Sequence, residues 1–312
     1  MTRPGIVIAL CLLCIAGVFV WRALVLTAGG DSPSADGALS PLAQRAQALE
    51  EEIFAYHLQD ALVIAQQADP AGRMLYSNEN AGLATGMLLS ALSHKWSVTG
   101  DLQTRARARQ IAGALAMLEK ITGVPGLTAR QYKKMPGPGP DENTWLRYDW
   151  HQAGEYRWLG NVSTDEMTWY LTGLGDYVML CAEGDDRRLA SGLIRRVTGR
   201  TLDHEMRITE ADGTTTAWGD CSRASPREPL FCLHGLHYLK VAELCAFDQR
   251  FADAYEEYAA DEQYLYQAVH CYKLGAQNRN WAGYDFELAA PAYELLIRFD
   301  KDPSRRAALV EG

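Results

Sequence analysis

Helical segments of two kinds alternate along most of this chain, and this alternation limits its fold more than any other feature of the sequence. Residues 80–97 are apolar nearly all round, as a buried inner helix would be. The turn Thr99-Gly100-Asp101 follows, and residues 102–121 then form a more polar segment suited to an outer helix. The same order returns in the pairs 164–182 with 187–208, 229–246 with 248–259, and 262–275 with 285–299.

Repeated pairs of inner and outer helices predict an all-α fold, either an α/α toroid or a helical solenoid. The inner helices would ring a central cleft, and the loops between pairs would form its rim. The sequence holds about ten helices, nearer five hairpins than six, so an open or incomplete ring is an alternative to a closed one. Residues 41–68 add an amphipathic helix whose apolar stripe is interrupted by Asp60. Only residues 206–218 are typical of strands, as a short β-hairpin around Asp212-Gly213.

Residues 1–30 differ in composition from the rest of the chain. Residues 5–21 carry no charge, Arg3 precedes them, and the apolar character resumes soon afterwards. This pattern is typical of a signal peptide or a membrane anchor, and its length favours an uncleaved anchor. Residues 31–40 form a small polar linker, which leaves residues 41–312 as the α/α-toroid domain. We therefore expect a protein of the cell envelope, membrane-anchored with the domain outside the cytoplasm (periplasmic), or secreted if the signal is cleaved.

The charge balance narrows the class of partner. The chain has 30 Lys+Arg against 39 Asp+Glu, a formal net charge of −9, so a nucleic-acid backbone and an anionic membrane surface are poor partners. The membrane would be contacted through the N-terminal segment only. Hydrophobic residues at 48% and charged residues at 22% are ordinary values for a folded protein and exclude disorder. Walker, Rossmann and GxSxG patterns are absent from the sequence, so we expect no cofactor.

The cysteines of the predicted domain admit two interpretations. Their odd number allows at most two disulfides. Cys221 and Cys232 flank a Ser/Pro/Arg loop and are the pair that we expect to be bridged outside the cytoplasm. Alternatively, all of these cysteines are small buried apolar residues. They are Cys181, Cys221, Cys232, Cys245 and Cys271.

Aromatic side chains concentrate in residues 122–163, which show little helical periodicity. Flat aromatic faces beside polar side chains suit sugar rings, because a sugar has an apolar C–H face and a polar edge. For any single tryptophan, packing of this long connection onto the helices is the alternative. The tryptophans that we take as candidate oligosaccharide-binding residues, here and elsewhere in the chain, are Trp145, Trp150, Trp158, Trp169 and Trp218.

Several short motifs occur in an order that resembles a known superfamily. They are SNENAGLATGMLLSALSHKWSVTGD, GVPGLTARQY, YRWLGNVSTDEMTWYLTGL and TTTAWGD. Over about residues 41–300 the chain resembles exported bacterial proteins of the six-hairpin glycosidase-like, α/α-toroid superfamily. Members of that superfamily are mostly carbohydrate-active, as hydrolases, lyases or epimerases. The resemblance therefore implies an α/α-toroid fold and a carbohydrate substrate.

Asp165 and Glu166 are the best catalytic candidates within this resemblance. They follow WLGNVST at the start of an inner helix, where the helix N-terminus favours a carboxylate and lowers its pKa. A lowered pKa suits a base or nucleophile better than a general acid. Glycoside hydrolysis needs two carboxyls, and adjacent helix residues diverge by about 100°, so these two cannot both form the pair. The second carboxyl must come from another element, for which we prefer Glu79 over Asp203.

Other polar residues complete the candidate site. Asp149 and Asp285 are further choices for the second carboxyl. Arg130 in GLTARQY and Asn161 are placed to orient substrate hydroxyls or a carboxylate group, and His234 is a candidate for lining the cleft. A second histidine lies one turn from His234, but no third ligand is evident and we predict no metal site. Each candidate also has a purely structural alternative, as a helix cap, a core residue or a solvated side chain.

Three functions remain open from the sequence. The first is an exported, membrane-tethered, glycoside hydrolase-like enzyme that binds an oligosaccharide or polysaccharide and cleaves it with Asp165 or Glu166 and a distant acid. The second is a polysaccharide lyase or epimerase, in which Tyr or His removes a proton beside a uronate carboxylate held by Arg130. The third is a non-catalytic, tethered module that binds a glycan or a protein partner.

Overall fold

Helices make up most of the computed structural model, which describes residues 40–68, 74–77, 79–135, 149–224, 228–277 and 283–312. This confirms the prediction of a mainly helical fold. The predicted anchor and all but the last residue of the predicted linker lie outside the described residues, as does Trp145. Within the described ranges, no helix has both the length and the apolar character that a membrane span requires.

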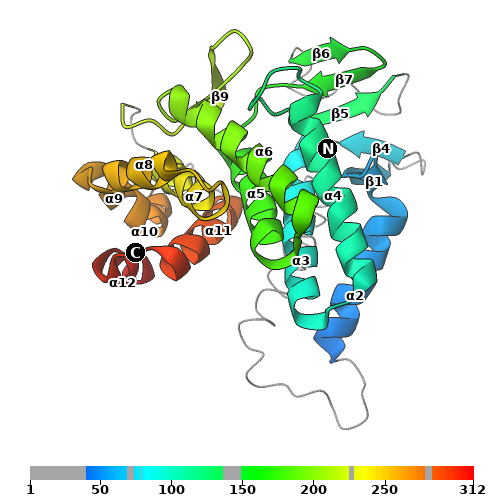
Figure 1. Cartoon of the computed structure of the whole chain (residues 1–312), viewed down its shortest axis with the longest axis horizontal. Coiled ribbons are helices and arrows are strands. Elements are labelled where there is room, and N and C mark those ends of the chain that lie inside the picture. The colour runs from blue at the N-terminus through cyan, green and yellow to red at the C-terminus, as the bar shows by residue number, and fades with distance from the viewer. Residues whose placement is uncertain (1–39, 69–73, 78, 136–148, 225–227, 278–282) are drawn as a thin grey trace.

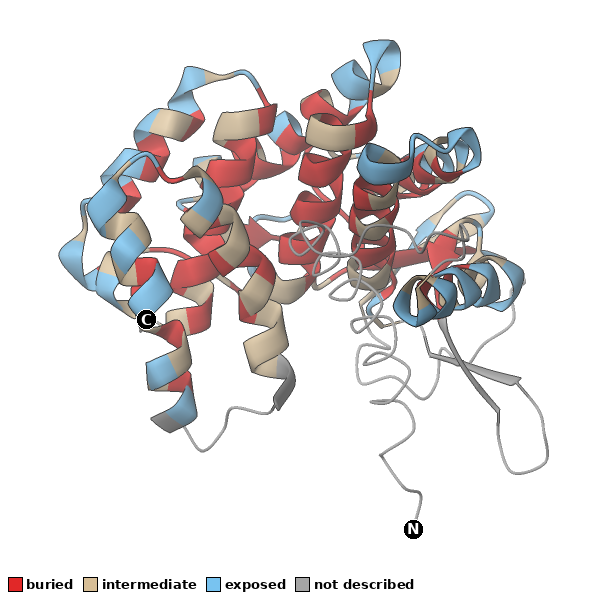
Figure 2. Ribbon diagram, turned by 90° about the horizontal axis from the view of Figure 1, so that it is seen from below, coloured by how far each residue is buried: buried red, intermediate tan, exposed pale blue. Residues whose placement is uncertain are grey.

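Three helical hairpins form the centre of the molecule (Figure 1). In each hairpin the first helix is the more deeply buried one, as the alternation of apolar and polar segments predicts. The hairpins are α3 (Ala81–Thr99) with α4 (Leu102–Lys120), α5 (Thr164–Asp176) with α6 (Gly184–Asp203), and α7 (Pro229–Cys245) with α8 (Gln249–Ala259). Figure 2 shows that buried residues gather on the central helices, whereas exposed residues lie on the outer ones.

Local capping explains how the first hairpin turns. The Asp101 side chain accepts hydrogen bonds from the backbone N–H groups of Gln103 and Thr104 and so caps the start of α4. Gly100 ends α3 at a φ of 63°, a left-handed conformation that glycine adopts without strain. The turn predicted at residues 99–101 is confirmed. In the second hairpin, α5 runs on into a π-helical turn, η1 (Tyr177–Cys181), before α6 begins.

The inner helices α3 and α5 cross at very short range because glycines lie at the contact. A Cβ atom added to Gly86 would lie 2.2 Å from the carbonyl oxygen of Trp169. A Cβ atom added to Gly173 would lie 2.4 Å from the carbonyl oxygen of Gly86. A larger residue at either position would therefore force the two backbones apart.

The remaining helices flank this centre. From its second turn onward, α11 packs against α7 and α5. The segment predicted as one helix at 262–275 is divided at His270, and the last helix of the chain is absent from the sequence prediction. These elements are α2 (Pro41–Tyr56), α9 (Glu262–Val269), α10 (Cys271–Gln277), α11 (Gly283–Phe299) and α12 (Pro303–Glu311).

Short antiparallel strands lie at one end of the hairpins (Figure 1). A three-stranded sheet has the order β5-β7-β6, and a separate hairpin, β8 with β9, confirms the one predicted around Asp212-Gly213. The strands are β1 (Leu58–Gln59), β2 (Leu62–Val63), β3 (Ala65–Ala68), β4 (Met74–Ser77), β5 (Gln131–Lys134), β6 (Trp150–Ala153), β7 (Tyr156–Leu159), β8 (Arg207–Thr209) and β9 (Thr215–Asp220). Strand β1 pairs with β2, and β3 pairs with β4.

One secondary-structure prediction is wrong, and another is incomplete. Residues 41–68 are not one helix, because α2 ends at Tyr56 and the chain reverses between β1 and β2. Asp60 and Ala61 make that reversal with φ values of 50° and 65°, a backbone that a continuous helix does not contain. The all-α prediction also omitted the strands other than β8 and β9.

The described cysteines are thiols, and none of them forms a disulfide. The predicted bridge between Cys221 and Cys232 is therefore wrong, whereas the alternative of small buried residues is confirmed. Burial raises the pKa of the Cys181 thiol to about 11, which keeps it protonated and unreactive.

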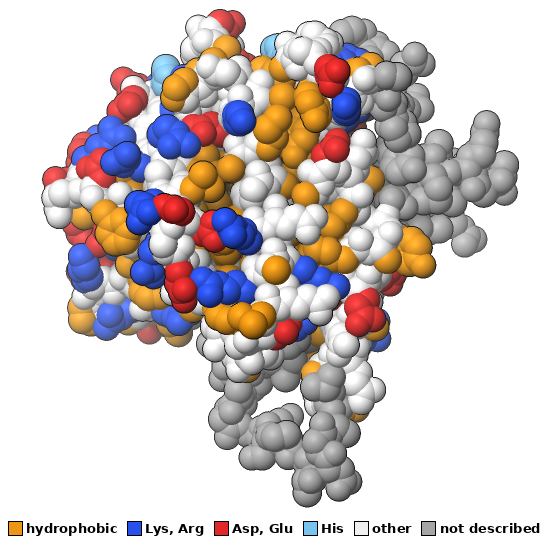
Figure 3. Space-filling model, turned by 45° about the vertical axis from the view of Figure 1, so that its right-hand side comes forward, with side chains coloured by type: hydrophobic (Ala, Val, Ile, Leu, Met, Phe, Trp, Pro, Cys, Tyr) orange, Lys and Arg blue, Asp and Glu red, His pale blue; other side chains and the backbone are white. Residues whose placement is uncertain are grey.

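Charges of both signs are interspersed on the outer layer. Arg196 on α6 donates two hydrogen bonds of 2.7 Å to the Glu119 carboxylate on α4. Arg105 and Glu183 form a second ion pair between these two hairpins, at 2.7 Å. The face in Figure 3 likewise mixes basic and acidic side chains, with hydrophobic side chains in small separate patches between them.

Candidate functional site

Arg130 holds together the loops that precede α3 and α5. Its side chain is 4% exposed, and its backbone joins the same assembly, since the Gly82 N–H donates to the Arg130 carbonyl oxygen at 2.8 Å. Each guanidinium nitrogen donates to an acceptor of the protein. The acceptors are the Glu79 carbonyl oxygen (2.8 Å from Nε), the Asn161 carbonyl oxygen and Ser163 Oγ (3.0 and 2.9 Å from Nη1), and Asn80 Oδ1 (from Nη2).

These contacts give Arg130 a different role from the predicted one. Four of its five N–H groups donate to protein acceptors, and its burial keeps a substrate carboxylate or hydroxyl from reaching the fifth. Arg130 therefore has a structural role, in which it joins the loop before α3 to the loop before α5. Glu79 is half-buried, and its backbone lies in this cluster.

Glu166 serves as a link between α5 and α3. Its side chain is 2% exposed, and its Oε2 accepts a hydrogen bond of 2.9 Å from the backbone N–H of Leu83. This bond caps the first turn of α3, where the Asn80 side chain is engaged with Arg130 instead. The other carboxylate oxygen, Oε1, lies 3.8 Å from Arg130 Nη2.

The electrostatic environment of Glu166 contradicts one prediction. Its position at a helix N-terminus predicts a lowered pKa. Burial instead raises the pKa of Glu166 to about 8 and outweighs the opposing effect of Arg130. A carboxyl in this environment does not behave as the ionised base that the sequence suggested.

Asp165 points to another part of the molecule. It is partly exposed and lies in the first turn of α5. Its negative charge acts on His234 and Tyr238, both on α7. Its charge also acts on Glu166, so the two carboxyls differ in burial, with Glu166 bonded to α3 and Asp165 partly exposed to solvent.

His234 lies where α5, α7 and α11 meet. It is fully buried, and its Nε2 lies 3.1 Å from the Leu288 carbonyl oxygen. A carbonyl only accepts, so Nε2 carries the proton and Nδ1 carries the lone pair of the neutral ring. Nδ1 is buried and has no hydrogen-bond partner among the described residues. Burial lowers the pKa of His234 to about 4, against the opposing charge of Asp165.

A second polar group surrounds Asn161 and includes a residue that the sequence prediction missed. Asn161 has a φ of 56°, and its backbone N–H donates to Glu210 Oε1 at 2.5 Å. Its side-chain Nδ2 lies 3.4 Å from Asp149 Oδ2, and its Oδ1 accepts from the Ala217 N–H at 2.9 Å. Asn161 therefore fixes the β8–β9 hairpin against the loop before α5. Glu210 sits in the hairpin segment that was predicted as strands, and no motif pointed to it.

The predicted tryptophans have unequal access to solvent. Trp158 is 5% exposed and stacks on His151 with ring centroids 4.1 Å apart. Trp150 is half-buried between the charged groups of Lys133 and Arg157. Trp169 is buried beside Met87 in the interior of the protein. Trp218 on β9 is 54% exposed, so it is the most exposed of the predicted tryptophans that the structure describes.

Asp203 and Asp285 lie on other elements. Asp203 is the last residue of α6, where it is exposed and paired with Arg250 at 3.2 Å. This ion pair on the outer layer does not bring Asp203 to Asp165. Asp285 lies in the first turn of α11.

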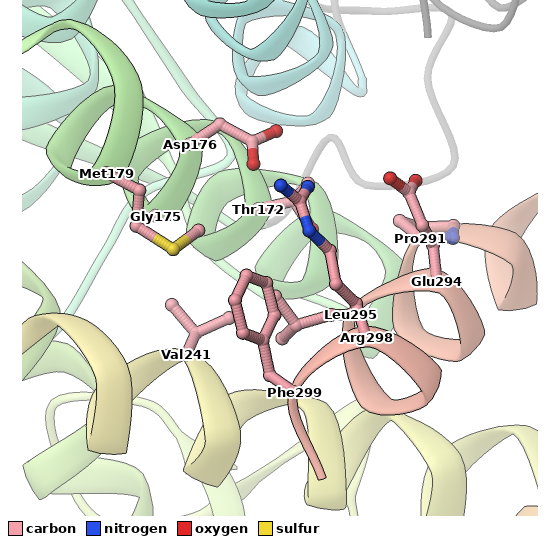
Figure 4. Close-up of a pocket in the computed structure, with 10 residues that line it drawn as sticks. All are labelled: Thr172, Gly175, Asp176, Met179, Val241, Pro291, Glu294, Leu295, Arg298 and Phe299. Carbon is pink, nitrogen blue, oxygen red and sulfur yellow. The ribbon is translucent and has the colours of Figure 1, made fainter. Parts of the chain in front are cut away.

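A shallow pocket, partly open to solvent, lies among the C-terminal halves of α5, α7 and α11 (Figure 4). Asp176 borders it and accepts a hydrogen bond of 2.5 Å from Ser90, with His94 Nε2 at 3.4 Å. Asp176 is eleven residues after Asp165, about 16 Å along the helix, so this pocket is separate from the Asp165 site. Its lining is Thr172, Gly175, Asp176, Met179, Val241, Pro291, Glu294, Leu295, Arg298 and Phe299.

The described side chains form no group of three or more His, Cys, Asp or Glu residues with the geometry to hold a metal ion. The two histidines one turn apart on α7 are directed to protein partners, since His234 contacts Leu288 and His237 Nε2 lies 3.0 Å from Thr172 Oγ1. Comparisons with protein-family models, with curated proteins and with solved structures found no match for this chain.

Proposed function

We propose that this chain is an exported, membrane-tethered, carbohydrate-active protein of glycoside hydrolase-like type, with Asp165 as its reacting carboxylate. The observation that carries the proposal is the difference in burial between the two adjacent carboxyls at the start of α5. Glu166 is buried and hydrogen-bonded to α3, whereas the adjacent Asp165 remains partly exposed to solvent. A carboxylate at a helix N-terminus, accessible to water, suits a base or nucleophile.

The arrangement of the hairpins supports an α/α toroid as the scaffold. Helices α3, α5 and α7 are the buried members of three successive hairpins, and α11 packs against α5 and α7 beside them. We propose that these four helices form the inner layer of an open or incomplete ring. The starts of α3 and α5 then belong to its rim, where the β5-β7-β6 sheet and the β8–β9 hairpin also lie.

The second carboxyl of a hydrolase is proposed to come from the same rim. Glu79 belongs to the Arg130 cluster and remains our preferred residue. Trp218, exposed on β9, is the proposed stacking surface for a sugar ring. The lyase or epimerase alternative has less support, because Arg130 is buried and four of its five N–H groups are bonded to the protein, so a uronate carboxylate has little access to it.

A non-catalytic glycan-binding module is the second candidate. The observation that favours it is that Glu166 is bonded to α3 and Asp203 is paired with Arg250, so neither supplies the second carboxyl that a hydrolase needs. Isothermal titration with oligosaccharides that shows binding, together with no turnover of the same compounds, would support this candidate over the enzyme.

Matched substitutions test the assignment of Asp165. The full chain is assayed for release of reducing sugar from a panel of oligosaccharides and polysaccharides. Asp165→Asn should lower turnover by about 10²–10⁴-fold, because it removes proton transfer or attack while keeping the shape of the side chain. Asp253→Asn, on the exposed surface of α8, makes the same chemical change away from the site and should leave turnover unchanged. Wild-type turnover that survives Asp165→Asn, with circular dichroism showing an intact fold, would refute the assignment.

A further inference from the structure

Three of the nine large apolar side chains that are exposed in the described chain lie at the end of the molecule where that chain begins. Val98 and Leu102 stand on either side of the α3–α4 turn and are 56% and 74% exposed. Leu42, in the first turn of α2, is 40% exposed. Single exposed apolar residues are common in proteins, but a group at one hairpin tip requires a physical reason.

Ion pairs fix these three residues at the same end. Glu50 on α2 contacts Lys95 Nζ at 2.7 Å and Arg107 Nη1 at 2.5 Å. Both bases lie within about two helical turns of the α3–α4 turn. Leu42 lies eight residues before Glu50, about 12 Å along α2 toward its start. Figure 1 accordingly shows the start of α2 and the α3–α4 turn together, away from the β5-β7-β6 sheet.

The surroundings of the tip suit the boundary between lipid and water. Trp96 is half-buried, and the Arg105 guanidinium lies over its ring at 5.3 Å. Tryptophan and arginine both combine an apolar body with a polar end, which favours the headgroup region of a bilayer. Asp101 lies in the turn itself, and hydrogen bonds from Thr104 lower its pKa, so it stays charged. That charge limits the tip to shallow contact with headgroups.

The chain that precedes α2 keeps this end close to a membrane if the N-terminal segment is an anchor. The apolar stretch ends at Leu26, and fourteen residues separate it from Pro41. Fourteen residues reach at most about 50 Å when fully extended, so an anchor that ends at Leu26 keeps Pro41 within that distance of the membrane. Burying three aliphatic side chains is too weak an interaction to recruit a soluble protein, but it can orient one that is already tethered.

We propose that Leu42, Val98 and Leu102 form a membrane-facing surface that docks on the headgroup region of a zwitterionic phospholipid bilayer. This inference rests on the N-terminal anchor of the proposed function and adds an orientation to it. It departs from the expectation that the N-terminal segment alone contacts the membrane. Helix α3 has 19 residues and is about 28 Å long. Docking by the α3–α4 tip would therefore hold the Arg130 and Asp165 end of the hairpins away from the membrane, toward a substrate outside it.

Depth-dependent labelling of the full chain tests this orientation. A chain with Cys11→Ala and Cys14→Ala receives a nitroxide label at Leu102→Cys and is reconstituted into phosphatidylcholine nanodiscs. The control label is placed at Phe247→Cys, since Phe247 is 76% exposed. The helix that follows the control, α8, pairs with the end of α6 through Arg250 and Asp203, away from the α3–α4 tip. Collisions with oxygen and with a water-soluble nickel chelate are then compared at the two positions.

The label at position 102 should show a several-fold higher ratio of oxygen to nickel collisions than the label at position 247. Adding Leu42→Ser and Val98→Ser should lower that ratio without changing the circular dichroism spectrum. Equal, water-like ratios at both positions in a chain that co-purifies with nanodiscs would overturn the docking surface alone. Failure to co-purify would overturn the anchor and the docking surface together, whereas glycan turnover, measured separately, decides the reaction.

Discussion

Replacing Gly86 with alanine should destabilise the protein, because a methyl group has no room where α3 crosses α5. The added Cβ would lie 2.2 Å from the Trp169 carbonyl oxygen and 2.6 Å from its carbonyl carbon. Ordinary van der Waals contact begins at 3.4 Å, so the helices would have to separate by about 1 Å. The clashing atoms belong to the backbone, so no side-chain rotation relieves the contact.

The magnitude follows from two opposing effects. Forcing an extra carbon into a packed interior costs about 1–3 kcal/mol, and a backbone clash belongs at the upper end of that range. Alanine in a helix interior recovers about 1 kcal/mol relative to glycine. The expected net loss is therefore about 2 kcal/mol in the free energy of unfolding.

Gly113 provides a matched control on the neighbouring helix. It is exposed on α4, and a Cβ atom added there meets nothing within 4 Å. Gly113→Ala should therefore raise stability by about 0.5–1 kcal/mol through helix propensity alone. Urea unfolding of each full chain in a mild detergent, followed by circular dichroism, gives the two midpoints. If Gly86→Ala unfolds at the same or a higher urea concentration than the wild type, the close crossing of α3 and α5 is incorrect.

Further predictions concern buried titratable groups and thiols. Burial raises the pKa of Glu166 to about 8, so its contribution to stability is complete below the ordinary pKa of 4.5 and is lost as the pH rises toward 8. Glu166→Gln should therefore lose less thermal stability between pH 5 and pH 8 than the wild type, and equal slopes would contradict the burial argument. The pKa of His234 is lowered from 6.5 to about 4, so stability should fall as the pH drops from about 6.5 to 4. Thermal melts of His234→Gln should show a weaker fall over that range, and an unchanged fall would exclude His234 as its source. Intact-mass measurement should find Cys221 and Cys232 reduced, and both should react with a thiol reagent only after denaturation; a loss of 2 Da for a bridge would contradict the structure.

The helical layout could be predicted because it depends on local pattern. The apolar segment that became α3 is buried nearly all round, and Asp101 caps α4 as its side chain allows. The end of α2 at Tyr56 was missed because the residues after it include apolar ones that fit a helical stripe equally well. The reversal depends on Asp60 and Ala61, which both have a positive φ. Neither residue is a glycine, the residue type that usually indicates such a turn.

The candidate site was predicted only as a set of residues. Arg130, Glu79 and Asn161 do come together, but the sequence could not show that Arg130 turns inward and bonds to peptide carbonyls. Burial also decides the separation of Asp165 from Glu166, since the pKa of Glu166 follows its surroundings and not its place on the helix. Glu210 was missed because its contact with Asn161 joins positions 49 residues apart.

Arg130 has a consequence for how the rim assembles during folding. The acceptors of its side chain come from residues 79–80 and 161–163, which are far apart in the chain. A guanidinium that loses its water before both groups are present is a buried charge without compensation, which is strongly unfavourable. The two loops should therefore dock in one cooperative step, and the amide hydrogens of Gly82 and Asn161 should exchange with solvent at a common rate.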